Sequence, residues 1–391
     1  MNRRTFLVSA LFGVLTSALG CKGARSIVKQ ESPEGLDDTT SNLQSKLNQG
    51  GLVRLEAGRY YSVRQPKGEK AALRIRSNTT LDLNGATLAL APGGHCSLIA
   101  TEGVAENICI ENGVIEGNGT LQPQAYKREI GITPTLYLMN CNRLTLRNLV
   151  VRDAYMYAAY IHGNDGVLKH VSVIGSVGGG IHVNGARWKI DDIDVKDITY
   201  FERVNCQGNP FIVSLKDSVI GCVRCENFGF GVKLQDGCEN VQVENIVAIG
   251  GLNNRPFPDY LVKIQGKKDP QHTHQNRGIR IGRIESFNGP MSGLYIYFSS
   301  DVSIGTYIGR DNGKSNPPDA KNGSDILIID SDDIHFGVID STGFPRNGLW
   351  LHRDCGKVSV KEARFSCGAS TPCPNPVVVQ GGQAVIDKTH F

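Results

Sequence analysis

The sequence predicts an all-β fold, a single solenoid built from about 12 short coils. A pattern of three short strands returns about every 22 residues from Leu73 to Phe391. Apolar residues alternate along the strands, which are separated by a small-residue turn and by an Asn or Asp corner. The 46 glycines agree with many tight turns, where a positive φ favours glycine, and only 20% of the residues are charged.

The repeat is clearest where the strands of successive coils are placed in register. Corner residues Asn148, His170 and Asp192 lie 22 residues apart, and alternating apolar residues follow each of them. The first strands of the coils are aligned to begin at Tyr160, Gly180, Val213, Val232, Val262 and Leu294. Because a solenoid stacks equivalent positions, outward residues should form straight rows along a groove that suits a long polymer.

The N-terminus has the pattern of an export signal. A basic start with Arg3-Arg4 precedes an apolar run and the small-residue exit at Gly20-Cys21. The paired arginines resemble the bacterial twin-arginine signal. We therefore expect a signal peptide over residues 1–21, a tether over 22–36 and one β-helix domain over 37–391. Lipidation of Cys21 would make this a lipoprotein, whereas cleavage near Gly20 would release a soluble secreted form.

These features predict a protein exported from a bacterial cytoplasm, which would be periplasmic, envelope-anchored or secreted. Membrane contact is expected only through a lipid on Cys21. The net charge of +4 and the pI of 8.4 are mild. Nucleic acid would favour a stronger, clustered basic bias, so no nucleic-acid partner is expected.

The cysteines allow two interpretations. Ten remain after Cys21, an even number that permits disulfides in an oxidising compartment. Two local pairs are suggested by their spacing, Cys222 with Cys225 and Cys367 with Cys373. The favoured alternative for most of the cysteines, including Cys96, Cys109 and Cys141, is a buried thiol that packs as a small apolar residue.

The first elements resemble a known superfamily. A short helix is expected over Thr39–Leu47, where Leu43 and Leu47 lie four residues apart and could cap the first coil. The stretch from Asp37 to Tyr60 resembles the entry segment of pectin-lyase-like proteins, and Leu73–Leu90 resembles their first complete coil. The resemblance covers nearly all of the chain. It implies a right-handed parallel β-helix but no particular activity, because the superfamily hosts lyases, hydrolases, epimerases and binding proteins.

Four stretches interrupt the repeat and are expected to be loops that wall the binding face. They are Thr120–Pro134, Gly251–Tyr260, Gly266–Gly278 and Asp311–Ser324.

The outward positions of the first strands are cationic, aromatic and amide-rich, with almost no acids. Aromatic rings can stack on sugars, and Lys or His can bind carboxylates or sulfates through charge-assisted hydrogen bonds. Asp165, Asp217 and Asp236 follow at turns, where Asp usually bonds to the backbone. The residues expected to bind substrate are Tyr160, His162, Asn164, Asn184, Lys216, Gln235, Gln265, Tyr295 and Tyr297.

A closer resemblance concerns the polygalacturonases. Gly113–Gly119 and Leu136–Ala154 resemble the matching stretches of those hydrolases. Their four catalytic motifs are replaced, however. Where they carry Asn-Thr-Asp, Asp-Asp, Gly-His-Gly and Arg-Ile-Lys, this chain has Val177-Gly178-Gly179, Asn209-Pro210, Gly229-Phe230-Gly231 and Lys263-Ile264-Gln265. Hydrolysis of a glycosidic bond normally needs two carboxyl groups, so the resemblance does not carry that chemistry over.

Elimination fits the groove better, because it needs a base beside a neutralised sugar carboxylate. Lys233 and Lys263 are expected one coil apart in the same row. Their repulsion would let one lose its proton more readily, so Lys233 is assigned as the base and Lys263 as the group that neutralises the carboxylate. His182 is the alternative base or proton donor. The sequence requires no cofactor, but Ca²⁺ could serve as an additional neutralising cation.

The expected function is therefore action on a long acidic polysaccharide, by lyase or C5-epimerase chemistry. One alternative is a glycoside hydrolase of polygalacturonase type, with acids from Glu129, Asp259 or Asp269. The other is a non-catalytic polysaccharide-binding envelope protein. The segment Asp269–His274, with His272 and His274, also has the composition of a metal-binding loop, but an ordinary surface loop is favoured.

Overall fold

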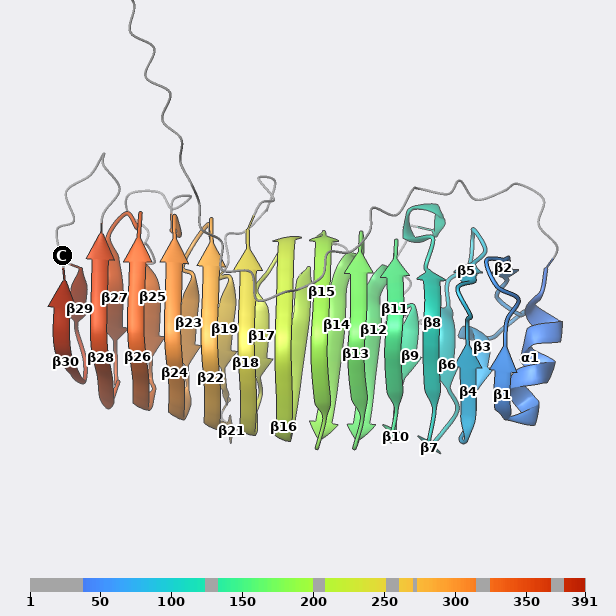
Figure 1. The fold of residues 1–391 in the computed structure, drawn as a ribbon, viewed down its shortest axis with the longest axis horizontal. Helices are drawn as coiled ribbons and strands as arrows, with labels where there is room; N and C mark the ends of the chain where they lie inside the picture. The colour runs from blue at the N-terminus through green and yellow to red at the C-terminus, as the bar shows by residue number, and fades with distance from the viewer. Residues whose placement is uncertain are drawn as a thin grey trace, which may run out of the picture. The chain divides into compact units, whose positions relative to one another are not determined.

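The structure is a computed structural model that describes residues 38–123, 133–199, 208–250, 260–269, 273–313, 324–366 and 376–390. Within these ranges the chain winds as a right-handed parallel β-helix, and strands one coil apart lie side by side (Figure 1). The predicted fold class is confirmed. The expected signal peptide, Cys21 and the tether lie outside the described residues. Among the described residues, no helix is long and apolar enough to cross a membrane.

The first stack of strands carries the predicted groove. Each strand pairs in parallel with its equivalent in the next coil. The stack consists of β3 (Ala71–Ile75), β6 (Ser97–Thr101), β9 (Leu136–Leu138), β12 (Tyr155–Asn164), β14 (Val177–Ala186), the first part of β16 (Asn209–Phe228), β17 (Val232–Gln235), β19 (Val262–Gln265), β23 (Leu294–Tyr297), β25 (Ser324–Ile329), β27 (Asn347–His352) and β29 (Val377–Val379).

The other two walls of the solenoid are formed mostly by long strands that turn a corner. They start as the separate strands β1 (Gly51–Arg54), β2 (Tyr60–Val63), β4 (Thr79–Asp82) and β5 (Thr87–Leu90). They continue, together with the second part of β16, as β8 (Cys109–Glu116), β11 (Thr145–Arg152), β13 (Val167–Ile174), β15 (Lys189–Ile198), β18 (Glu239–Ile249), β22 (Asn276–Phe287), β24 (Ser299–Arg310), β26 (Asp332–Thr342), β28 (Lys357–Ser366) and β30 (Gln383–His390).

Four short strands and one turn of 3-10 helix lie outside the three main walls of the solenoid. β7 (Ala105–Glu106) pairs in parallel with β10 (Cys141–Asn142). β20 (Lys267–Lys268) pairs antiparallel with β21 (Thr273–His274), so part of the predicted loop after β19 is a small hairpin. The 3-10 helix covers Gly119–Leu121.

The interior of the solenoid is filled by aligned aliphatic side chains. Alternate residues of each strand point inward, and pairing in register places each one against its equivalent in the next coil. One such inner row runs through Ile161, Val183, Val213, Leu234, Ile264, Ile296, Ile328 and Leu351, each at most 1% exposed. Burying one aliphatic side chain contributes about 1.5–3 kcal/mol, so repetition of the row stabilises every coil.

The predicted corners are real features of the backbone. Asn148, His170 and Asp192 have φ values of 52°, 53° and 54°, in the left-handed region that Asn and Asp tolerate better than most residues. Their side chains also bond along the row. The Asn148 amide donates to the Asn112 side chain at 3.0 Å, and His170 pairs with Asp192. The corner is therefore stabilised by contacts between coils.

The N-terminal cap is the expected helix. α1 (Thr40–Gln49) buries Leu43 and Leu47 against the first coil. Gln44 reaches β3, since its side-chain oxygen accepts a hydrogen bond from the Arg74 amide at 2.8 Å. The helix thereby covers the exposed end of the apolar core.

One predicted disulfide is wrong. Cys222 and Cys225 are both free thiols, and only Cys225 is buried. The two residues are three positions apart on one strand and point to opposite faces, so Cys225 packs in the core while Cys222 lies nearer the surface. Cys96 and Cys141 are buried free thiols, as the favoured interpretation expected, and Cys109 is only partly buried. Cys367 and Cys373 lie outside the described residues.

A polar network interrupts the apolar core near β25. Asp325 accepts hydrogen bonds from the Tyr307 hydroxyl at 2.6 Å, the Asn312 amide at 2.7 Å and the Ser341 hydroxyl at 2.5 Å. Burial raises the pKa of Asp325, although these hydrogen bonds act against that shift. A buried carboxyl group is tolerated only when its oxygens are satisfied, so the three donors and Asp325 depend on one another.

Replacing Asp325 should therefore be costly. We expect Asp325→Ala to lower the free energy of unfolding by about 2–3 kcal/mol, because it leaves the buried Ser341 hydroxyl without its acceptor and removes one acceptor each from Tyr307 and Asn312, which keep their contacts with Ser286. Thermal unfolding followed by circular dichroism measures this loss. Glu56→Ala, which removes an exposed ion pair with Arg59, is the control and should cost about 0–1 kcal/mol. Equal midpoints for the two variants would contradict this account of the network.

Candidate functional site

The outer face of the first stack carries two parallel rows of side chains. The outer row is defined by backbone pairing and contains Tyr137, Tyr160, His182, Ile212, Lys233, Lys263, Tyr295, Leu327 and Trp350. The second row lies two residues further along each strand and contains His162, Asn184, Ser214, Gln235, Gln265, Tyr297, Ile329 and His352. Most of the predicted groove residues lie in these two rows.

The sequence alignment of the coils needs a correction at three places. His182 pairs with Tyr160 rather than with His162, and Val213 pairs with Leu234 rather than with Val232, which are shifts of two residues. Val213 also pairs with Val183 rather than with Gly180, a shift of three residues. A shift of two residues leaves every side chain on its expected face, because strand side chains alternate with period two. It does change the row. Lys216 falls beyond the second row, at the last position where β16 pairs with β14.

The centre of the outer row brings the predicted catalytic residues together. Lys233 pairs directly with Lys263 in the next coil, and His182 lies two coils before Lys233. The exposed fractions of His182, Lys233 and Lys263 are 9%, 8% and 8%. Adjacent strands are ~4.8 Å apart, so the two lysine stems run side by side in a recessed position. The Lys263 ammonium also lies 5.2 Å from the ring centre of Tyr260.

His182 lies in an aromatic environment. Its ring meets that of Tyr160 edge to face at 4.6 Å and lies 6.3 Å from the ring of Tyr157. Neither ring nitrogen has a partner with good hydrogen-bond geometry, so the contact with Asn184 is weak. Burial is the main cause that lowers the pKa of His182 to about 4; the Asn184 side chain opposes this shift, and the positive charge of Lys233 adds to it. His182 is therefore neutral near pH 7, which suits a base better than a proton donor.

Aromatic residues continue the face on the C-terminal side of the lysines. Tyr295 stacks on Tyr260 with ring centres 4.3 Å apart and lies parallel to Tyr297 at 6.1 Å. Trp350 follows two coils later, with its ring centre 5.0 Å from that of His352. Tyr260 thus covers one face of Tyr295, a contact that the sequence did not predict.

A cavity of about 630 Å³ opens at the carboxyl ends of β12, β14 and β17, beside Ser214 and Lys216 of the first part of β16. We call it the strand-end cavity. It gathers four predicted binding residues, His162, Asn164, Asn184 and Lys216. It also contains residues with no predicted binding role, which sequence periodicity could not bring together. These are Ser214, Asp236, Lys267 and His274, with small residues Gly185, Ala186 and Gly237.

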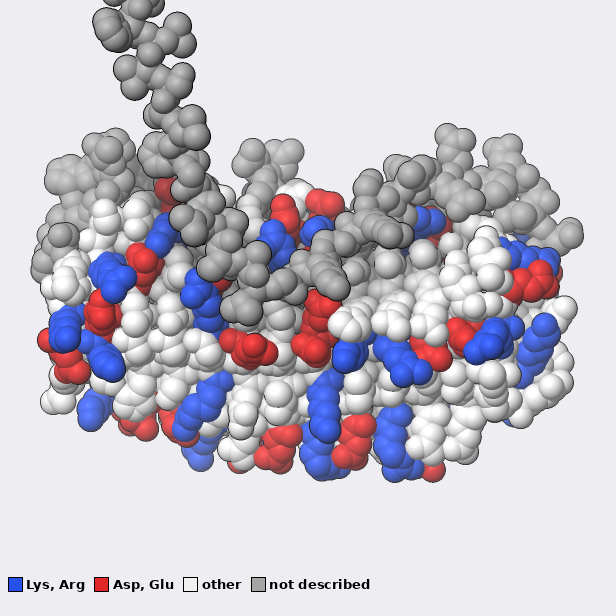
Figure 2. All heavy atoms as spheres, viewed as in Figure 1, with Lys and Arg blue, Asp and Glu red and all other residues white. Residues whose placement is uncertain are grey.

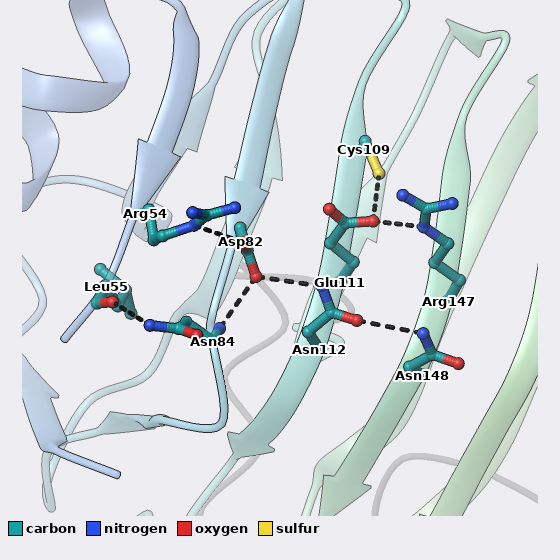
Figure 3. A network of polar contacts seen from close by, with 9 residues as sticks. All are labelled: Arg54, Leu55, Asp82, Asn84, Cys109, Glu111, Asn112, Arg147 and Asn148. Carbon is teal, nitrogen blue, oxygen red and sulfur yellow. Dashed lines mark hydrogen bonds and ion pairs between the residues drawn. The ribbon is translucent and has the colours of Figure 1, made fainter. Parts of the chain in front are cut away.

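Acidic residues are arranged differently from the cations of the outer row. In β4 and β8, Asp82 and Glu111 are adjacent, but Arg54 and Arg147 pair with them from either side (Figure 3). Although burial acts to raise the pKa of Asp82, hydrogen bonds from Asn112 and Arg54 outweigh it and lower that pKa. This pair belongs to another wall of the solenoid, and its oxygens are engaged in the ion pairs and hydrogen bonds drawn.

Acidic and basic side chains also lie side by side on other parts of the surface. Figure 2 shows basic and acidic side chains next to one another across the face in view, in keeping with ion pairs such as Arg143–Glu106 and Arg280–Asp301. Among the acids proposed for a hydrolase, Asp269 pairs with Lys267 at 3.6 Å, and Glu129 and Asp259 lie outside the described residues. His272 lies outside them too. Across the described ranges no group of three or more His, Cys, Asp or Glu is placed to hold a metal ion.

Comparison with known proteins bears on the fold. No family model and no curated protein match this chain. The structure resembles a tailspike protein double mutant of E. coli bacteriophage HK620 in complex with pentasaccharide, with a TM-score of 0.51 and 12% identity over 90% of this chain. This chain spans 63% of that tailspike chain. Another variant of the same tailspike gives a TM-score of 0.55 and 11% identity over 88% of this chain and 75% of the tailspike.

A third similar structure is the A-module of the Azotobacter vinelandii mannuronan C-5 epimerase AlgE4, with a TM-score of 0.45 and 14% identity over 90% of this chain and 94% of the module. Identities this low indicate a shared fold only. With the parallel stacks described above, the two tailspike matches support one conclusion. The chain has the right-handed parallel β-helix fold.

The environment of His182 makes a direct prediction. Its imidazole should titrate with a midpoint of about 4, far below the ordinary value of about 6.5, because its charged form is buried beside Lys233. Lys233→Met should raise that midpoint by removing a nearby positive charge. Nuclear magnetic resonance titration of the histidine ring signals measures both values. A midpoint near 6.5 in the unaltered protein would show that the ring is solvated.

Proposed function

We propose that this protein acts on a long acidic polysaccharide, cleaving a uronate-containing glycan by β-elimination or inverting its sugar at C5. The observation that carries the proposal is the direct pairing of Lys233 with Lys263 in the recessed centre of the outer row. Two adjacent ammonium-bearing side chains favour a negatively charged group, and a recessed position strengthens that attraction. A uronate carboxylate is such a group.

The reaction can be written with these residues. The Lys263 ammonium holds the sugar carboxylate, which lowers the energy of the carbanion-like state formed at C5. The Lys233 amine takes the C5 proton, and the electrons of the broken C–H bond form a double bond between C4 and C5. The C4–O4 bond breaks, and O4 leaves after receiving a proton from a neighbouring acid or water. Return of a proton to the opposite face of C5, without loss of O4, would give epimerisation instead.

Neutral His182 supports the same chemistry as the alternative base. Its unprotonated ring lies two coils from Lys233, within the same row. The tyrosines on either side would contact the flanking sugars, with Tyr160 before the lysines and Tyr297 after them. Gln235, Gln265 and Asn184 in the second row would bond to sugar hydroxyls.

Two further observations support a polysaccharide as the partner. A tailspike with this fold is known in complex with a pentasaccharide, so the fold can present an oligosaccharide-binding surface. The signal-like N-terminus supports export to a compartment where such polymers occur. We propose that the protein is periplasmic, secreted, or anchored to the envelope by a lipid on Cys21.

The proposed reaction is tested by offering uronate polymers to the purified protein. Cleavage by elimination should create new ultraviolet absorbance from the unsaturated product. Lys233→Ala should lower kcat by about 100-fold or more, as expected for removal of a base. Lys169→Ala, on another wall of the solenoid, is the matched control and should keep full activity. Full turnover in Lys233→Ala would refute the assignment, and reducing ends without new absorbance would indicate a hydrolase.

Binding can be followed without turnover. The chain has two tryptophans. Trp188 is sealed in the core, where its indole N–H donates to the Gly163 carbonyl at 2.9 Å, whereas Trp350 belongs to the outer row. Uronate oligosaccharides should therefore change the fluorescence of Trp350 alone, and Trp350→Phe should abolish the response. A neutral glucan is the control. An unchanged response in Trp350→Phe would place the sugar away from this row.

A further inference from the structure

We propose that the strand-end cavity is a second binding subsite for an acidic sugar unit, completed by the β20–β21 hairpin. The inference rests on the proposed function for one point only, the identity of the ligand in the cavity. That ligand is another unit of the same polysaccharide. The outer row would hold the reacting unit, and the strand-end cavity would hold a unit that carries its own carboxylate or sulfate.

The hairpin directs a lysine and a histidine into the cavity. Lys267 and His274 are direct partners in the antiparallel pairing of β20 with β21, and cross-strand partners project from the same face of a ribbon. Both line the strand-end cavity. Lys268 projects to the other side, where it lies 3.7 Å from Asp330 and 5.7 Å from the Phe298 ring centre. The hairpin thus assigns different surroundings to two neighbouring lysines.

The charges that line the cavity favour an anion. Lys216 and Lys267, with His162 and His274, surround it, whereas Asp236 is its one carboxylate among the described lining residues. The lysines do have acidic partners outside the lining. Lys216 pairs with Glu239 at 3.1 Å and Lys267 with Asp269 at 3.6 Å.

These two ion pairs do not prevent anion binding. All four side chains are well exposed, and exposed ion pairs contribute only about 0–1 kcal/mol. A carboxylate or sulfate could therefore draw either ammonium into a charge-assisted hydrogen bond. Asn184 and Ser214, which also line the cavity, offer groups that can bond to sugar hydroxyls.

The position of the cavity indicates how the polymer is arranged. Ile212 occupies the outer row between His182 and Lys233, and Lys216 lies four residues further along the same strand. A strand rises ~3.3 Å per residue, so the cavity is ~13 Å from the outer row, measured across the coils rather than along the solenoid. A ligand that fills both subsites must carry acidic groups on at least two sugars, on a bent chain or on a branch.

Asp236 allows a second test, in which binding affinity is expected to change in the opposite direction. Burial raises the pKa of Asp236, while the charges of Lys267, His274 and Lys233 act to lower it, so this carboxyl group senses the cations of both the cavity and the outer row. Its negative charge would repel a bound anion. Asp236→Asn should therefore bind acidic oligosaccharides more tightly, whereas loss of a cavity cation should weaken their binding.

The experiment compares Lys267→Ala with Lys268→Ala, two charge losses on adjacent residues of one hairpin. Isothermal titration calorimetry would use oligouronates of increasing length and a sulfated neutral oligosaccharide. We expect Lys267→Ala to weaken binding of the longer oligouronates about tenfold, as for loss of one charge-assisted hydrogen bond. Lys268→Ala should stay within about twofold of the unaltered protein. Weaker binding of only the sulfated ligand would identify a sulfate as the occupant.

The outcomes separate this inference from the proposed reaction. Equal affinities for Lys267→Ala and Lys268→Ala would overturn the subsite, even if uronate polymers are cleaved. Selective weakening in Lys267→Ala, with no cleavage of any uronate polymer, would support the subsite and refute the reaction. Asp236→Asn is expected to change the affinity in the opposite direction from Lys267→Ala. Tighter binding by Asp236→Asn could not result from a damaged fold.

Discussion

Parallel pairing in register is the constraint on which the rest of this structure depends. Each residue lies ~4.8 Å from its equivalent in the next coil, so whatever one position carries is repeated along a row. Inside the solenoid this repetition gives rows of aliphatic side chains, such as the one from Ile161 to Leu351. On the outside it places Lys233 beside Lys263, although their positive charges repel each other.

On another wall of the solenoid, pairing in register brings acidic side chains next to basic ones. In β1, β4, β8 and β11 the charged positions run Arg54, Asp82, Glu111 and Arg147, so each acid has an arginine neighbour. Corner residues bond to one another in the same way, as Asn148 does with Asn112. In the outer row the strand partners of Lys233 are Ile212 and Lys263, and Lys263 is followed by Tyr295. This side-by-side placement of two recessed lysines is the physical basis for assigning the acidic ligand to this face.

Sequence periodicity predicted the fold and the face of each strand residue, because alternation with period two is fixed by the strand itself. It could not fix the row, because a shift of two residues preserves the alternation; His182 was misaligned with His162, and Val232 with Val213, for this reason. Nor could it find the role of Lys267 and His274. They reach the cavity through a short antiparallel hairpin inside an interruption of the repeat, where no periodic signal exists. The suggested Cys222–Cys225 disulfide is absent because both residues lie on one strand, where residues three apart point to opposite faces.

The central claim is that the outer row binds an acidic sugar between Lys233 and Lys263. The most direct measurement is a crystal structure of the Lys233→Ala protein, which should retain its substrate, with a bound oligouronate. The account predicts a sugar carboxylate within hydrogen-bond distance of the Lys263 ammonium, with C5 facing the position of the missing lysine. An oligosaccharide lying along another wall, or bound here with its carboxylate turned away from Lys263, would contradict it.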